Sequence, residues 1–212
     1  MPGVTTRGRR GVALTLDACG GSDLGNGFDA DLIALLERHE VPATLFLNGR
    51  WIHANPSIAA DLAAHPLFEL ANHGWEHRPL SVTGASAYGI AGTNSPAGVY
   101  DEIVRGIDAL AEVSGERSPF FRPGTAWCDD VAVEIAARLG VSVIAFDVNA
   151  DAGATASKAS VAAGLGKARD RSIVIGHFNR PAGATAEGFV QALPTLLDRG
   201  VRFAKLSDAL AD

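Results

Sequence analysis

Short apolar segments alternate with segments of helical periodicity along most of the chain, and this alternation constrains the fold more than any other feature. Seven segments have the length and apolar content of buried strands: 12–17, 43–48, 68–72, 120–122, 141–147, 172–177 and 201–206. Six segments repeat apolar residues at helical spacing: 29–39, 55–65, 96–115, 129–139, 157–169 and 185–199. Continuous apolar strands that alternate with helices are typical of a parallel sheet with helices on its faces.

The number of predicted strands favours a closed but incomplete barrel, with an open doubly wound sheet as the alternative. A length of 212 residues suits one domain, and no repeat, low-complexity tract or linker interrupts the alternation. We therefore expect residues 1–212 to form a single α/β domain.

The composition excludes several classes of partner. A net charge of −6 argues against a nucleic acid or an anionic membrane as the main partner, since both bind basic surfaces. No apolar run approaches the roughly 20 residues that a membrane-spanning helix needs. The two cysteines, Cys19 and Cys128, are too few for a disulfide framework.

The N-terminal segment gives an expectation about localisation. Arg7, Arg9 and Arg10 are followed by a predicted strand and not by the apolar region of a signal peptide. We therefore expect a cytoplasmic protein for the sequence as given, or a secreted or periplasmic one if a leader has been removed.

Acids, histidines and an arginine occur where the predicted strands end. The polar residues at or just past these ends are Asp17, Asn48, His73, Arg122, Asp147 and His177. In a parallel α/β barrel, the carboxyl ends of the strands form the rim on which active sites are built. Because acids, histidines and arginine are the residue types of acid–base and metal catalysis, the pattern indicates an enzyme active site at this rim.

His73 and His77 are four residues apart, in the run NHGWEH that starts at Asn72. On a helical turn this spacing places both imidazoles on one face, where they could bind a transition metal. The polar segment 79–95 follows directly, and a loop of that length in a compact domain is usually functional. We therefore predict a metal-binding pair where strand 68–72 ends and a helix or loop begins, with a substrate-side loop beside it.

Five short motifs, in order from Thr15 to His177, make the chain resemble the polysaccharide deacetylase family, the NodB homology domain of the family 4 carbohydrate esterases. The resemblance implies a deformed (β/α)7 barrel of the NodB type. It also implies a C–N hydrolase that removes N-acetyl or similar acyl groups from an amino sugar or polysaccharide.

The first two motifs carry the base and the metal ligands of the family. The family motif T-F-D-D corresponds to TLDA here, so the resemblance assigns the general base to Asp17 but places Ala18 where the family has a metal ligand. The motif H-S/T-x-x-H corresponds to the pair His73 and His77, with Gly74 at the hydroxyl position. The resemblance therefore implies a divalent metal, with zinc expected first and cobalt or nickel as alternatives.

Ala18 leaves the third metal ligand open. Two imidazoles bind a divalent ion weakly, and catalytic zinc sites normally have three protein ligands. We expect Asp17 to be the third ligand. The alternatives are an enzyme that works without metal and, after that, a thiolate ligand from Cys19.

The remaining motifs supply the partners of the base and the acid. Arg122, in a reduced R-x-x-x-P motif, would keep the base ionised, and His177 at the end of the fifth motif would be the general acid. The fourth motif has lost its tryptophan. Asp151 fits best as the acid that supports His177, and Asp147 is the rival.

Three further residues near these motifs are candidates for substrate binding: Trp75, Trp127 and Asn179. The expected partner is an N-acetylated carbohydrate or a small amide. Two other functions stay open, namely a metal-independent amidohydrolase of small amides or ureides, similar to the allantoinase-like relatives, and a carbohydrate-binding relative without catalysis.

Overall fold

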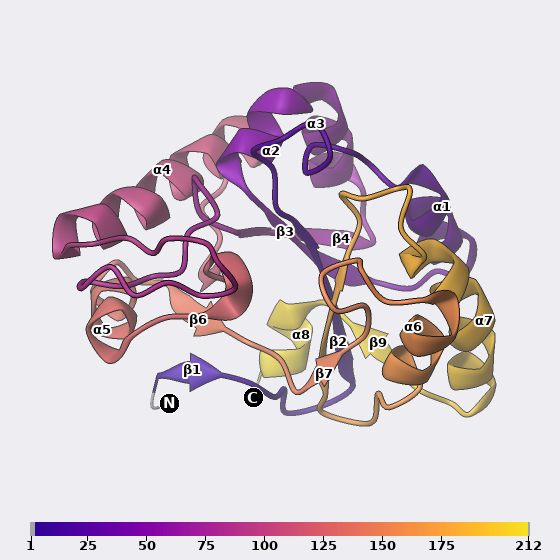
Figure 1. The fold of residues 1–212 in the computed structure, drawn as a ribbon. Helices are drawn as coiled ribbons and strands as arrows, with labels where there is room; N and C mark the ends of the chain where they lie inside the picture. Colours follow the sequence, from indigo (N-terminus) through magenta and orange to yellow (C-terminus); the bar gives the residue numbers. More distant parts are fainter. Residues whose placement is uncertain (1–2, 212) are drawn as a thin grey trace.

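A parallel sheet of nine strands lies at the centre of residues 3–211, the part of the chain that the computed structural model describes (Figure 1). The strands are β1 (Val4–Thr5), β2 (Val12–Ala18), β3 (Ala43–Leu47), β4 (Phe68–Asn72), β5 (Phe120–Phe121), β6 (Ser142–Ile144), β7 (Val148–Asn149), β8 (Ile173–His177) and β9 (Phe203–Ala204). Their order is β1-β6-β5-β4-β3-β2-β8-β7, and β9 pairs with β2. All of these pairings are parallel, as the sequence predicts.

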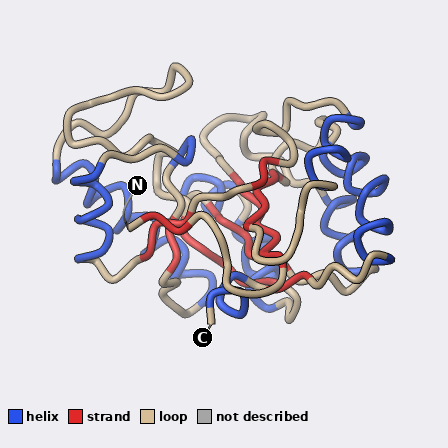
Figure 2. Tube along the Cα trace, turned by 90° about the horizontal axis from the view of Figure 1, so that it is seen from below, coloured by secondary structure: helices blue, strands red, loops and turns tan. Residues whose placement is uncertain are grey.

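The sheet curls into an incomplete barrel. β1 and β7 are its two edges, and no ladder joins them within the described residues. Figure 2, which views the molecule from below, shows the strands gathered in the centre with helices on either side. The prediction of a deformed (β/α) barrel is therefore confirmed, although the sheet has more strands than the seven predicted.

The helices form two groups around the sheet. They are α1 (Ala30–Arg38), α2 (Gly49–Ala54), α3 (Pro56–Ala64), α4 (Pro96–Ser114), α5 (Asp130–Arg138), α6 (Lys158–Leu165), α7 (Thr185–Asp198) and α8 (Leu206–Leu210), with a 3-10 turn η1 (Gly124–Ala126). On one side α7 contacts α1 and α6, and on the other α4 contacts α2, α3 and α5 (Figure 1). No helix within residues 3–211 is both long and apolar enough to span a membrane.

The core has an outer and an inner part. The largest apolar cluster, with Leu14 and Leu45, fills the space between the strands and the helices around them. A smaller cluster inside the curled sheet contains Ala13 and Ile173, and α8 contributes Leu206 to it. Because side chains alternate along a strand, residues an even number of positions after Ala13 or Ile173 also point inward.

One predicted strand is too long. The predicted strand 141–147 ends early: β6 stops at Ile144, the chain crosses to the opposite edge of the sheet, and Asp147 precedes β7. Of the helix and the loop that the sequence leaves open after β4, the structure has the loop, with positive φ at Gly74 (+75°) and His77 (+62°). The sequence does not predict β1, β7, α2 or α8, because elements this short show no clear period.

Candidate active site

Asp17 and His177 face the same interior space. They are paired residues of the neighbouring strands β2 and β8. Each lies four positions after an inward residue, Ala13 or Ile173, so alternation points both side chains into the curled sheet. The charge of His177 is one of the causes that lower the pKa of Asp17, which places the two groups within electrostatic reach.

Arg122 holds the carboxylate of Asp17. Its Nη1 donates to Asp17 Oδ1 at 2.7 Å and to Thr15 Oγ1 at 2.9 Å. Its other nitrogens donate to the carbonyls of Ile144 and Ala145, so the fully buried guanidinium is held on several sides. Burial raises the pKa of Asp17, but the charge of Arg122 and of the nearby imidazoles outweighs burial, and the net pKa lies below its usual value. Asp17 is therefore an ionised, oriented carboxylate.

Asp151 is the partner of His177. Its Oδ1 lies 2.9 Å from His177 Nδ1, while its Oδ2 accepts hydrogen bonds from the His177 backbone N–H at 2.7 Å and from Thr185 Oγ1 at 3.0 Å. Burial lowers the pKa of His177, but hydrogen bonds to Asp151 and Cys19 outweigh burial, and the pKa lies well above its usual value. The rival Asp147 instead accepts from the backbone N–H of Ile173, at the opposite end of β8.

The imidazoles of His73 and His77 lie beside this pair of acid and base. Their ring centroids are 4.8 Å apart and the rings are nearly perpendicular. The two rings meet although the segment between them is a loop and not a helical turn. His73 Nδ1 lies 2.8 Å from the carbonyl oxygen of Arg122, and because a carbonyl only accepts, this nitrogen carries a proton and Nε2 is the nitrogen that faces Cys19 and Asp17.

The thiol of Cys19 completes the cluster. The donor atoms of Cys19, His73 and His77 all lie within 4.8 Å of one another, and Cys19 Sγ is 3.9 Å from His73 Nε2. Burial raises the pKa of Cys19, but the charge of His77 and hydrogen bonds with the surrounding imidazoles, including His177, lower it well below its usual value. Ala18, one residue earlier, lies in the outer apolar cluster and offers no donor.

The residues of this cluster fit a divalent cation. One cysteine and two histidines are a known ligand set of catalytic zinc, with a further position left for water or substrate. Asp17, which the sequence favours as the third ligand, has Oδ2 at 3.5 Å from His73 Nε2 while Oδ1 is bound to Arg122. The geometry thus offers two candidates for the third ligand, Cys19 and Asp17.

Sequence reasoning missed the residue that braces the loop of His73 and His77. Glu102 on α4 is only 4% exposed and accepts hydrogen bonds from the backbone N–H groups of Glu76 and Arg78 at 3.0–3.2 Å. The sequence feature that could have identified Glu102 is its position among the apolar residues of the predicted helix, where an acid is unexpected. Its carboxylate fixes the backbone on both sides of His77.

Close packing of the backbone also shapes this loop. Gly74 N donates to Asn72 Oδ1 at 2.8 Å, and Asn48 Nδ2 donates to the carbonyl of Gly74 at 3.0 Å. A Cβ at Gly74 would lie 2.5 Å from Glu102 Oε1, in addition to the strain of its positive φ. A Cβ at Gly124, in the third motif, would overlap the carbonyl of His77. Glycine at these two positions lets the second and third motifs approach each other.

The three candidate substrate residues lie in different surroundings. Trp75 is half-buried, touches the backbone of Gly49 on α2, and has the guanidinium of Arg105 at 4.1 Å from its ring centroid. Trp127 is half-buried beside η1. Asn179 is buried, and its Nδ2 donates to the carbonyl of Gly25 at 2.8 Å in the glycine-rich loop after β2. Their roles in substrate binding stay predictions.

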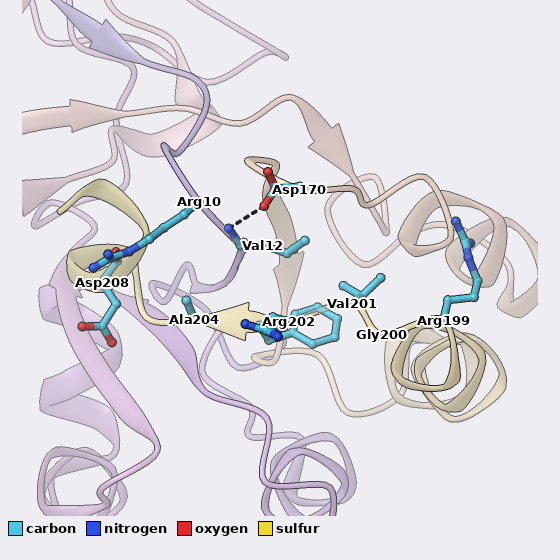
Figure 3. A pocket seen from close by; sticks show the side chains of 11 residues that line it. Arg10, Val12, Asp170, Arg199, Gly200, Val201, Arg202, Ala204 and Asp208 are labelled. Carbon is cyan, nitrogen blue, oxygen red and sulfur yellow. Dashed lines mark hydrogen bonds between the residues drawn. The ribbon is translucent and has the colours of Figure 1, made fainter. Parts of the chain in front are cut away.

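A sizeable hollow in the described part of the chain lies away from this cluster. It measures about 620 Å³ and is lined at the start of β2 and β9 by side chains that include Arg10, Arg202 and Asp208 (Figure 3). The dashed line in Figure 3 marks the bond from the Gly11 backbone N–H to Asp170. No histidine or cysteine lines this hollow, so we place the candidate site at the opposite end of β2.

Comparisons with known proteins identify the family. The family described as polysaccharide deacetylase matches residues 5–144. A chitooligosaccharide deacetylase from Bradyrhizobium sp. (strain ANU 289) is 28% identical over 145 residues, which cover 67% of this chain and 58% of that protein. A solved peptidoglycan N-acetylglucosamine deacetylase is 21% identical and matches with a TM-score of 0.80 over 98% of this chain and 92% of its own.

A pseudoenzyme of the same esterase family, from Bacillus anthracis, is also similar in structure, with 21% identity and a TM-score of 0.79 over 100% of this chain and 70% of its own. At such identities, a structural match establishes the fold alone. The chain spans just over half the length of the curated relatives it matches, 54% and 58%. The family match itself covers more than half of the chain, and the chain belongs to the polysaccharide deacetylase family.

Proposed function

We propose that the protein hydrolyses the N-acetyl group of an amino sugar within an oligosaccharide or polysaccharide, and that residues 1–212 act as one deacetylase domain. The observation that carries this proposal is the paired arrangement of Asp17 and His177 on β2 and β8, each bound to its own partner, beside two imidazoles. Membership of the polysaccharide deacetylase family, and a relative named as a chitooligosaccharide deacetylase, support the type of reaction.

Asp17 acts as the general base. Hydrolysis of an amide requires removal of a proton from the attacking water, and a carboxylate can accept it when the carboxylate is ionised. Arg122 keeps Asp17 ionised and fixes Oδ1, which leaves Oδ2 as the oxygen that receives the proton. Arg122 also confines the carboxylate to one orientation toward the interior.

His177 acts as the general acid. An amine is a poor leaving group unless it is protonated as the C–N bond breaks, so a donor must lie beside the nitrogen. Because Asp151 occupies Nδ1 and raises the pKa of His177, the ring is protonated and its Nε2–H is the group that donates. Base and acid thus both come from inward-facing positions on neighbouring strands.

His73 and His77 hold a divalent cation, and zinc is the first choice for imidazole ligands, with cobalt or nickel as alternatives. When bound, the cation polarises the acetamide carbonyl and lowers the pKa of water. Asn179, Trp75 and Trp127 are proposed to contact the sugar. The Oδ1 of Asn179 is buried and has no hydrogen-bond partner among the described residues, which supports its part.

The test is release of acetate and free amine from N-acetylglucosamine oligomers. Wild-type protein is expected to release both in equal amounts, and His177→Ala is expected to lower kcat by about 10²–10⁴-fold, the usual contribution of a positioned acid. His39→Ala, at the C-terminal end of α1, serves as the control and should retain full activity.

The same assay distinguishes the proposed deacetylase from a carbohydrate-binding protein without catalysis. Ala18, at a family ligand position, and the structural likeness to a pseudoenzyme favour that alternative. It predicts sugar binding that His177→Ala leaves unchanged, together with no release of acetate from any acetylated oligomer tested. That pair of results would overturn the proposed function.

A further inference from the structure

The cluster of Cys19, His73 and His77 has the spacing of a metal site. In a tetrahedral zinc site with bonds of about 2.0–2.3 Å, donor atoms lie about 3.5 Å from one another. Cys19 Sγ and His73 Nε2 are 3.9 Å apart, and the three donor atoms all lie within 4.8 Å. A shift of less than one ångström by each side chain would therefore bring these atoms to bonding positions around one ion.

Cys19 follows directly after Ala18, the position where the family has its carboxylate ligand. Side chains alternate along β2, so Asp17 faces the interior and Ala18 faces the helices. Cys19, the first residue after β2, has its sulfur 3.9 Å from His73 Nε2. Cys19 is thus the next residue able to reach the imidazoles once the ligand position is taken by alanine. The carboxylate of Asp17 is a weaker candidate, because Arg122 binds it in a buried ion pair.

The grouping of donor atoms supports the same choice. Among the histidines, cysteines and acids of residues 3–211, the group of three or more whose donor atoms come together as a candidate ion site is Cys19, His73 and His77. Asp17 does not belong to it. In addition, the carbonyl of Arg122 fixes the His73 ring so that Nε2 points toward the sulfur.

We infer that Cys19 is the third protein ligand of the cation, as a thiolate, and that it replaces the carboxylate ligand of the family. This inference rests on the proposed function in that both place a divalent ion at His73 and His77. The thiolate is the form that binds, and any thiol proton still present passes to solvent on binding. The resulting Cys/His/His site prefers zinc and cobalt over hard ions such as magnesium.

The role of Asp17 follows from this assignment. A carboxylate that bonds a cation through one oxygen and Arg122 through the other would be a poor base, because both positive charges lower its pKa. With sulfur as the third ligand, Asp17 Oδ2 stays available to act as the base. One site thereby provides separate residues for metal binding and for proton transfer.

Cobalt binding tests the inference by spectroscopy. The full chain is freed of metal with a chelator and titrated with Co²⁺ alone, and absorption is recorded. We expect one equivalent to bind with a thiolate-to-cobalt charge-transfer band in the near ultraviolet. Cys128→Ser, which alters the other cysteine, should keep the band. Cys19→Ser should lose it and bind Co²⁺ at least about 100-fold more weakly, since even outer partners of a metal site contribute 10–100-fold.

A further variant distinguishes the loss of a metal ligand from a failure of the variant to fold. Cys19→Asp should bind Co²⁺ more tightly than Cys19→Ser but without the charge-transfer band, because oxygen replaces sulfur. The inference is overturned if wild-type protein with one bound Co²⁺ shows no thiolate band, a result that does not depend on whether a variant folds. It is also overturned if Cys19→Ser binds Co²⁺ as tightly as wild type.

The outcomes for the ligand and for the reaction are distinguishable. Release of acetate by a protein whose cobalt spectrum lacks sulfur would overturn the Cys19 assignment and leave the proposed function standing. A thiolate band in a protein that releases no acetate from acetylated sugars would support the Cys19 assignment and contradict the proposed function.

Discussion

Asp17 and His177 are directly paired across the neighbouring strands β2 and β8, and their pKa values are shifted in opposite directions. Arg122 and the imidazoles hold the pKa of Asp17 below its usual value, whereas hydrogen bonds to Asp151 and Cys19 hold that of His177 well above. The carboxylate and the imidazolium are therefore present over the same pH range. Two titratable groups with opposite shifts in one site are the arrangement that acid–base catalysis requires.

Replacing Asp151 by asparagine should move the pH profile of the enzyme. Asp151 is a cause of the raised pKa of His177, and Cys19 and Asp17 are the other titratable groups with which His177 interacts. Asp151→Asn lowers the pKa of His177, so the ring loses its proton at lower pH and the alkaline limb of kcat/KM shifts to lower pH. The measurement is kcat/KM for acetate release across the pH range.

Asp147→Asn is the matched control for this shift. Asp147 bonds the start of β8 and lies near Arg7, so its charge does not support the His177 ring. Its variant should leave the alkaline limb where wild type has it. A shift with Asp147→Asn and none with Asp151→Asn would reverse the assignment of the two acids.

Loss of Arg122 should destabilise the fold as well as the activity. Arg122→Met leaves the buried carboxylate of Asp17 without its counter-ion, which is expected to lower the free energy of unfolding by about 3–5 kcal/mol. Arg122→Met combined with Asp17→Asn should recover part of that loss, because no charge is then left unpaired. Urea unfolding measures both, and equal losses in the single and the double variant would show that the ion pair is not the cause.

Removal of the Glu102 carboxylate should weaken metal binding at a distance. Glu102→Ala frees the backbone of Glu76 and Arg78, so His77 is no longer held in position, and affinity for zinc is expected to fall about 10–100-fold. Glu102→Gln keeps an acceptor oxygen and should lose less. Asp108→Ala, on the exposed side of α4, provides the control. Competition with a chelating dye reports zinc affinity, and wild-type affinity in Glu102→Ala would refute the bracing role.

Chelation should abolish activity without unfolding the protein. The main apolar clusters are built from the strands and helices and do not include His73 or His77, so the fold does not depend on the ion. After exhaustive chelation, acetate release should fall to background while the far-ultraviolet circular dichroism stays unchanged, and added zinc should restore release. Full activity after chelation would favour the metal-independent amidohydrolase.

Much of the fold and part of the site can be predicted from the sequence because parallel strands impose simple rules. An acid at the end of one buried strand and a histidine at the end of another must meet at the same rim, and Asp17 and His177 do. Cys19, just past the end of β2, is from the sequence the third choice for the missing ligand, after Asp17 and a site without metal, because no periodic pattern fixes the direction of its side chain.

Other features of the site depend on contacts that no local pattern contains. The loop of His73 and His77 has positive φ at Gly74 and His77 because Glu102, from a different element, binds its backbone. The sequence leaves a helix or a loop open there, and the contact with Glu102 is not visible in it. Likewise, the sequence favours Asp151 over Asp147 only by resemblance, because the choice depends on where β6 stops and the chain crosses the open side of the barrel.

The most direct measurement of the central claim is acetate release by Asp17→Asn, His177→Ala and the double variant, compared with wild type. Groups that act in one step on one bond are strongly non-additive. If Asp17 and His177 act on the same acetamide, each single variant loses about 10²–10⁴-fold in kcat and the double variant is little slower than the slower single variant. Losses that multiply in the double variant, or a single variant with wild-type kcat, would contradict the account.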